Sequence, residues 1–471
     1  MTNSPEAFNL RIYGRDPQVS AEWISPRGMR QLVSRSIEVD NLRLRTVDAL
    51  VDLLRRNQLH RVDEMELLGE HMFVTLFGSS QEPQDPGGLL RMALRGEDAG
   101  EEEDSEAAGR RMMRVSLEID SWNERLAAWP WEYLFVPREP DNSESGIFLG
   151  ESAKLVLTRR LRLSDVQRPI VVRPPLRVLF AVLSPNDLDP IEYSAVLEEL
   201  VGLTSADRSE RIALRVFSQH HAPDGTEHPD PEGDVRTTYE RFVEALDEFN
   251  PHVIHVIGHG KYGMLDSEGP YGQLAFPKVD WRARWISDRV IANELQDRNL
   301  RLVFLQACET ATTSSHPYHA ISGLAQSLAQ KNIPAVIAMH FQVNSRMASE
   351  FARAFYKPLM ERKHIEVAMH AGRRKLHVGE VGDGVQRRGF GVPVLYLRES
   401  SPLLVAHAAP STSVGSVGSV AAGPALRASE PSTGYEPRFE PPRAGEPAAT
   451  GDERLEAHRG TERISGERNS A

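Results

Sequence analysis

Residues 253–260 read VIHVIGHG and residues 302–309 read LVFLQACE. Each opens with a nearly unbroken apolar run, which is typical of a strand buried on both faces in a parallel sheet. Each run is followed by a reactive side chain, His259 in the first stretch and Cys308 in the second. Because reactive groups gather at the carboxyl ends of strands in open α/β sheets, we expect both side chains at one edge of one sheet.

Strand and helix patterns alternate around these two stretches. Short apolar runs predict four further strands, and the segments between them carry apolar side chains at helical spacing. The strands are expected at 176–183, 212–217, 335–338 and 392–397, and the helices at 191–203, 239–249, 321–328 and 347–359. This alternation predicts an α/β fold in which a mostly parallel six-stranded sheet is covered by helices on both faces.

The chain divides by composition into three parts. Residues 1–170 are less regular and predict an N-terminal α+β accessory region, with a helix at 46–56 and a strand at 113–119. Residues 171–400 hold the alternating pattern. Residues 401–471 are rich in Ala, Gly, Pro, Ser, Glu and Arg, and such a low-complexity segment buries too little apolar area to offset the entropy of ordering it. We therefore expect a disordered C-terminal tail.

Two local features of the first part are interpreted structurally. Residues 97–106 are strongly acidic and are expected to form a solvated loop. Trp129, Trp131 and Tyr133 place three large aromatic rings within five residues, which indicates a buried core rather than a ligand cage.

The overall composition limits the classes of function. The chain has 471 residues and a net charge of −12, and this acidic balance argues against direct nucleic-acid binding. No apolar run approaches the ~20 residues that cross a bilayer. The first ten residues lack the pattern of a signal peptide. We therefore expect a cytoplasmic protein that does not act at a membrane.

Cofactor and metal chemistry are not indicated. The single cysteine excludes an internal disulfide and a cysteine-rich zinc site. No glycine-rich phosphate or dinucleotide motif follows the first strand of the second part, and no serine nucleophile elbow is found, which argues against nucleotide enzymes and serine hydrolases. His252 and His255 are three residues apart, so on a strand they face opposite ways. No cofactor and no metal ligand set is predicted.

His259 and Cys308 together suit nucleophilic catalysis. A free thiol is mostly protonated at neutral pH, and a nearby imidazole can take its proton and later protonate a leaving amine. The developing oxyanion needs fixed backbone donors, for which the N–H groups of Gly260 and Cys308 are the candidates. Gly258 is expected to allow a sharp exit from the strand. Either residue alone is more often structural, but the pair at two strand ends predicts a catalytic dyad.

The sequence at this point resembles the CHAT domain, the caspase-like domain of HetF-associated proteins in the caspase/separase clan. The resemblance covers about residues 110–400, and the Gln-Ala-Cys motif with a histidine about 50 residues upstream also matches the caspase signature, although the glycine expected after the cysteine is missing. The segments that carry it lie at 131–134, 184–189, 257–260, 302–310, 323–328, 333–338 and 390–396.

The resemblance implies a caspase-like fold and a cysteine endopeptidase that cleaves protein substrates with His259 and Cys308. It also implies a bacterial defence or cell-death effector, which an activating protein partner switches on. Many relatives carry tetratricopeptide repeats, and this chain shows none, so its mode of activation stays open.

Three acidic residues are candidates for substrate binding. Enzymes of the wider clan often hold the P1 side chain in a charged pocket at the strand ends, and Asp187, Asp189 and Glu309 could line such a pocket and select Arg or Lys. The alternative for Asp187 and Asp189 is that they cap a helix beginning near Pro190.

A second class of function stays open beside the enzyme. The chain could be a catalytically silent caspase-fold pseudoprotease that acts as a binding or signalling module. The stretch from Lys261 to Trp285 is rich in Gly and polar residues, and we expect it to form loops beside the dyad that move on activation.

Overall fold

The computed structural model describes most of residues 6–398 and no residue beyond them. The larger gaps lie at 96–111, 139–145, 161–171, 205–211, 227–236, 310–319 and 379–388, and shorter ones at 26, 38–40, 57, 60, 79–81, 83, 121–122, 153–154, 222–223, 266–268, 332, 341–344 and 362. The side chains of some further residues, 262–265, 269–271, 307–309 and 320–323 among them, are also outside the description. The expected acidic loop and the expected disordered tail therefore lie outside the described residues.

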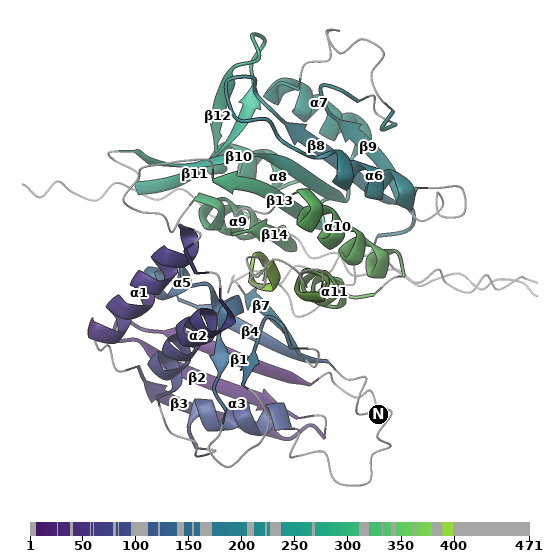
Figure 1. Cartoon of the computed structure of the whole chain (residues 1–471). Coiled ribbons are helices and arrows are strands. Elements are labelled where there is room, and N and C mark those ends of the chain that lie inside the picture. The colour runs from purple at the N-terminus through teal and green to yellow at the C-terminus, as the bar shows by residue number, and fades with distance from the viewer. Residues whose placement is uncertain are drawn as a thin grey trace, which may run out of the picture. The chain divides into compact units, whose positions relative to one another are not determined.

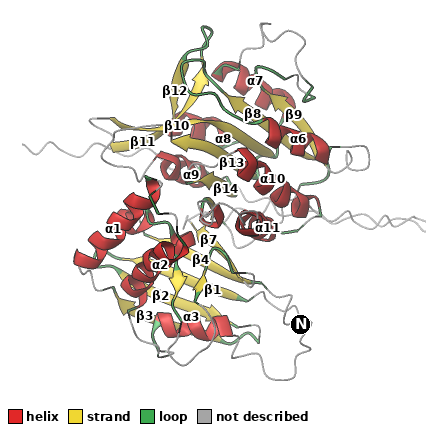
Figure 2. Cartoon of the chain, viewed as in Figure 1, coloured by secondary structure: helices red, strands yellow, loops and turns green. Residues whose placement is uncertain are grey.

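The second part of the chain is the predicted α/β assembly. Parallel pairing joins β9, β8, β10, β13 and β14, and β15 closes this part of the sheet by pairing antiparallel with β14. Figure 2 shows how strands and helices alternate here. The strands are β8 (Leu176–Leu183), β9 (Ile212–Phe217), β10 (Val253–Leu265), β13 (Leu302–Glu309), β14 (Ala335–Met339) and β15 (Pro393–Leu397).

Helices pack against both faces of these strands, as predicted. One apolar cluster joins the strands to α6 (Ser194–Leu203), α10 (Ser345–Met360) and α11 (Ile365–Val378). The cluster on the other face holds α7 (Tyr239–Phe249), α8 (Asp288–Leu295) and α9 (Ala320–Gln330). The side chains of each strand lie alternately in the two clusters, because successive residues of a strand point to opposite faces.

The predicted fold class is confirmed, but the sheet has more strands than the six expected, because it gains strands from residues 261–287 and from the first part of the chain. Figure 1 shows the strands of the first part. In the described residues the sheet has 13 strands, and the order runs from β15 to β7, β4, β1, β2 and β3. These are β7 (Leu155–Arg160), β4 (Met113–Ile119), β1 (Ala7–Tyr13), β2 (Gln18–Ile24) and β3 (Arg30–Ser36). The predicted strand at 113–119 is β4.

A separate apolar core lies against this second stretch of sheet. It is built from the inward residues of β1, β2 and β4 and from three helices, α1 (Asn41–Arg55), α2 (Val62–Phe77) and α3 (Pro86–Arg95). The three aromatic rings predicted to be core belong to it, since Trp129, Trp131 and Tyr133 are at most 1% exposed. They lie around a short 3-10 helix, η2 (Trp131–Tyr133), which follows α5 (Glu124–Ala127) and precedes the small hairpin β5 (Phe135–Val136) and β6 (Ile147–Phe148).

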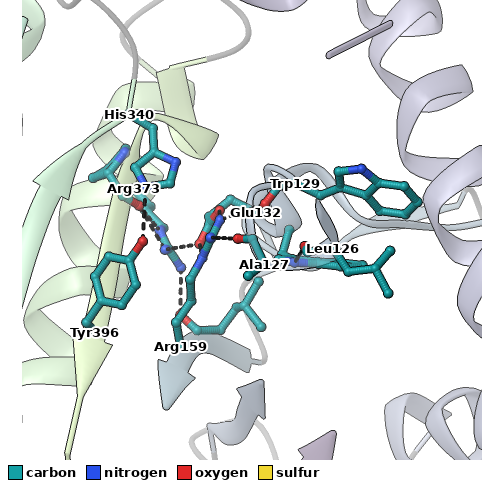
Figure 3. A network of polar contacts seen from close by, with 11 residues as sticks. Leu126, Ala127, Trp129, Glu132, Arg159, His340, Arg373 and Tyr396 are labelled. Carbon is teal, nitrogen blue, oxygen red and sulfur yellow. Dashed lines mark hydrogen bonds and ion pairs between the residues drawn. The ribbon is translucent and has the colours of Figure 1, made fainter. Parts of the chain in front are cut away.

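A buried charge cluster holds the junction between β15 and β7 (Figure 3). The two strands share only two register pairs, and the guanidinium of Arg373 on α11 donates hydrogen bonds to the carbonyls of Pro393 and Leu157 at 2.8–3.1 Å. Arg159 on β7 forms a two-pronged ion pair with Glu132 of η2, at 2.7 and 3.2 Å. Side chains therefore connect the strands where the backbone ladder is short.

The stretch from Lys261 to Trp285 forms strands rather than the loops that its composition predicts. β10 continues to Leu265 and pairs antiparallel with β11 (Gly269–Pro277), which pairs with β12 (Ala283–Ser287). Leu274 and Phe276 of β11 are buried in the α7–α9 core. The alternation of Leu274 and Phe276 indicates a strand, but the glycine content of the stretch led to the prediction of loops.

Candidate active site

His259 and Cys308 are partners across the parallel pair of β10 and β13. The backbone register aligns Ile257 with Gln306 and His259 with Cys308. Neighbouring strands lie ~4.8 Å apart, and aligned residues of a parallel pair belong to the same face. The fold therefore brings the two predicted dyad positions side by side, at the end of β13 that the α/β rule selects.

The ring of His259 is held by a backbone carbonyl. His259 is 3% exposed, and its Nε2 lies 2.8 Å from the carbonyl oxygen of Asp189. Because a carbonyl only accepts, Nε2 carries the proton in this bond, and the neutral ring then has its lone pair on Nδ1. The hydrogen bond thus fixes the tautomer and the orientation of the His259 ring.

Two hydrogen bonds hold the segment that supplies this carbonyl. The amide of Asn186 donates to the carbonyl of Trp281 at 2.8 Å, and the carboxylate of Asp187 accepts from the amide of Ala283 at 2.7 Å. These bonds attach the segment after β8 to the turn between β11 and β12 and to the first residue of β12. The β11–β12 hairpin thus helps to set the place of Asp189, and through it the orientation of His259.

Comparison with known proteins identifies the family. The family model of the CHAT domain matches residues 103–400, which is more than half of the chain. The chain belongs to the CHAT domain family. A comparison with curated proteins found no match.

One solved structure similar to this CHAT protein is the Saccharomyces cerevisiae separase–securin complex. The match has 11% sequence identity and a TM-score of 0.39, and it covers 83% of this chain and 30% of that chain. The CHAT protein thus spans less than a third of the chain that it matches.

The other predicted site residues of the CHAT domain fall in different environments. Gly260 lies inside β10, with Glu309 as its partner on one side and Leu274 on the other, so the strand does not end at Gly258 as expected. The side chain of Glu309 is outside the description. The expected cap by Asp187 and Asp189 is also wrong, because α6 begins at Ser194 and Tyr193 is its N-cap.

The two aspartates have different roles in the structure. The carboxylate of Asp187 accepts a hydrogen bond from a backbone amide, whereas Asp189 contacts His259 through its carbonyl, and both aspartates are exposed.

Among the described residues, no three His, Cys, Asp or Glu side chains gather in a way that could hold a metal ion, and no helix is long and apolar enough to span a membrane.

Sequence reasoning missed a polar cluster beneath the dyad positions. His255, Gln306 and Tyr356 are all buried within the core that β10 and β13 share with α10. The position of Gln306, two residues before Cys308 on the same strand, was the available signal, because strand alternation gives 306 and 308 the same face.

Proposed function

We propose that this CHAT protein is a cysteine endopeptidase that cleaves protein substrates with His259 and Cys308. The observation that carries the proposal is the register of β10 and β13, which aligns the two residues, together with the carbonyl of Asp189 that orients the histidine. Membership of the CHAT family, which is caspase-like, supports the same chemistry.

The reaction is acyl transfer through a thioester. Nδ1 of His259 takes the proton of the Cys308 thiol, and the thiolate attacks the carbonyl carbon of the scissile bond. The oxyanion accepts hydrogen bonds from backbone N–H groups, for which the N–H of Cys308 and that of Gly260 are the candidates. The imidazolium then protonates the leaving amine. A water molecule, deprotonated by the same histidine, hydrolyses the thioester and restores the thiol.

Substrate choice follows from the charge beside the dyad. Asp189 is exposed and directly contacts the catalytic histidine through its backbone, so its carboxylate lies on the segment that borders the scissile bond. A carboxylate there favours Arg or Lys as the P1 residue, since hydrogen bonds to charged groups contribute about 1.5–3 kcal/mol. Asp187 and Glu309 are the further candidates for this role.

The cellular role that we propose is a bacterial defence or cell-death effector that an activating protein partner switches on. The support is the family, and the partner is expected to bind outside the dyad. Cytoplasmic location fits this role and is part of the proposal.

The test compares new protein N-termini in bacterial cells that express the wild type, Cys308→Ala or His259→Ala. If the proposal holds, wild type generates peptides cut after Arg or Lys that both variants lack. Cellular effects that persist unchanged in Cys308→Ala, without any wild-type-specific cleavage, would instead assign the fold to a pseudoprotease that works by binding.

A further inference from the structure

The segment between β8 and α6 carries the carbonyl that orients His259, and it is attached to the rest of the fold at two places. Its first half is hydrogen-bonded to the β11–β12 hairpin. Its last residue is Tyr193, the N-cap residue of α6. Asp189, whose carbonyl contacts His259, lies between these two attachments. The position of that carbonyl therefore depends on both of them.

The second attachment is made by the hydroxyl of Tyr193. The residue is 7% exposed, and its hydroxyl lies 3.1 Å from Oγ of Ser218 and 3.0 Å from Nδ1 of His221. A phenol has one proton to donate, so it donates to one of these atoms and accepts from the other. Burial raises the pKa of Tyr193, so the proton stays on the phenol at physiological pH. Both hydrogen-bonding functions of the hydroxyl are thus used.

The two partners of this hydroxyl follow directly after β9. Ser218 is 1% exposed, and its Oγ also accepts a hydrogen bond from the amide of His220 at 3.3 Å. The ring of His221 meets the ring of Tyr193 edge-on, with 5.5 Å between the centroids and an interplanar angle of 76°. On β8, Phe180 contributes a further aromatic contact to Tyr193, at 6.5 Å between centroids. Tyr193 therefore connects the start of α6 with the end of β9.

The residues between Asp189 and Tyr193 form a short, stiff link. Residues 190–192 take part in no hydrogen bond among the described residues, so the link has no support of its own. Pro190 fixes its own φ and restricts the backbone of the residue before it, which is Asp189. A movement of the backbone at Tyr193 is therefore passed on to the Asp189 carbonyl.

We propose that Tyr193 positions the dyad histidine, His259, through the carbonyl of Asp189. The inference rests on the proposed function. Tyr193 is a positioning residue, because its hydroxyl is bound to the residues after β9 and not to the reacting atoms. The anchored segment keeps the carbonyl on Nε2 of His259, which leaves Nδ1 as the nitrogen that can take the thiol proton.

The test uses alkylation by iodoacetamide, which reports on Cys308 alone because the chain has one cysteine. Tyr193→Phe removes the hydroxyl and keeps the ring beside Phe180. A loosened carbonyl lets the His259 ring turn, so the thiolate loses part of its imidazolium partner and the apparent thiol pKa rises. We expect a rise of about one pKa unit, which makes alkylation about tenfold slower at a pH below both pKa values.

A second variant and a matched control accompany Tyr193→Phe. Ser218→Ala removes one of the two partners of the hydroxyl and should raise the thiol pKa by less. Tyr133→Phe makes the same chemical change in a tyrosine that is 0% exposed and belongs to the core of the first part of the chain. This control should keep the wild-type pH profile, whatever its effect on stability. All profiles are recorded well below the unfolding temperature of each variant.

The outcomes separate the role of Tyr193 from that of the dyad. The inference is supported if Tyr193→Phe raises the thiol pKa and Tyr133→Phe does not. It is overturned, and the dyad kept, if His259→Ala changes the profile while Tyr193→Phe reacts like the wild type. An equal rise in Tyr133→Phe also overturns it, because the effect is then not specific to the segment. If wild type and His259→Ala react alike, the dyad itself fails and the inference falls with it. Should Tyr193→Phe not fold, Ser218→Ala decides.

Discussion

Replacing Glu132 by glutamine should be among the most damaging conservative changes in this chain. Glu132 is 1% exposed and forms a two-pronged ion pair with Arg159, which is 6% exposed. Its Oε1 also lies 3.7 Å from the guanidinium of Arg373, which is 1% exposed. Glutamine keeps the shape of the side chain and removes the only carboxylate that contacts both arginines among the described residues.

The expected loss of stability follows from the burial of this ion pair. Breaking a buried ion pair by neutralising one partner costs about 3–5 kcal/mol, because the other charge stays buried without compensation. The compact unit spans Met1–Pro410. At ~2.1 cal/mol/K of unfolding entropy per residue, such a unit loses about 1.2 °C in Tm per kcal/mol. Glu132→Gln should therefore lower Tm by about 4–6 °C.

The assay is thermal unfolding of the purified protein, with Glu240→Gln as the matched control. Glu240 pairs with Arg284, but the two side chains are 62% and 47% exposed, and exposed pairs contribute about 0–1 kcal/mol. The control should lower Tm by no more than about 1 °C. Equal, small shifts in the two variants would refute the claim that the Glu132 cluster holds the junction of β15 and β7.

Three further predictions address packing, pH and specificity. Gly69→Ala places a Cβ 2.2 Å from a backbone carbonyl oxygen and should lower the free energy of unfolding in denaturant by at least about 1–3 kcal/mol. The control Gly202→Ala on α6 meets open space and should raise this free energy by up to about 1 kcal/mol. A Gly69→Ala protein as stable as the wild type would contradict the packing around Gly69. Because the pKa of His255 is lowered in the folded state, the unfolded chain binds a proton below pH 6.5 that the folded chain does not bind. The free energy of unfolding should therefore fall from pH 6.5 toward pH 4, and His255→Phe should reduce this pH dependence in urea titrations. An unchanged pH dependence in His255→Phe would contradict the lowered pKa. Asp189→Asn should reduce kcat/KM for P1 Arg peptides about 10- to 100-fold and Asp187→Asn should not; the reverse order would move the specificity role to Asp187.

The alternating part of the fold could be read from the sequence because its signals are local. β8 and β9 have the predicted bounds, since each is a short apolar run that ends in polar residues. β10 runs eight residues past Ile257, where its apolar run ends, because pairing with β11, rather than composition, decides where the strand ends. Pairing between distant segments leaves no such local signal.

The continuation of the sheet through β15 and β7 depends on contacts that no local pattern reports. Arg373 lies in a helix whose sequence contains several basic residues, yet it is buried against carbonyls of β15 and of β7, which is 216 residues away in the chain. A charged residue in a helix is usually solvated, so its burial could not be predicted from the sequence alone.

The candidate site was predictable where it consists of side chains at strand ends. His259 and Cys308 were predicted as partners, and the backbone register aligns them. The carbonyl of Asp189 carries no sequence signature, because every residue has one, and only the path of the segment after β8 brings it to the histidine. The burial of His255 and Gln306 in the core was missed because single polar residues in apolar runs look like interruptions of a strand.

The pH dependence of Cys308 alkylation in the folded protein shows whether His259 activates the thiol. We expect wild-type protein to react with iodoacetamide with an apparent pKa well below the ~8.5 of a free thiol, and His259→Ala to return the pKa to that value. Identical profiles for the two proteins, both with an ordinary thiol pKa, would show that His259 does not activate Cys308.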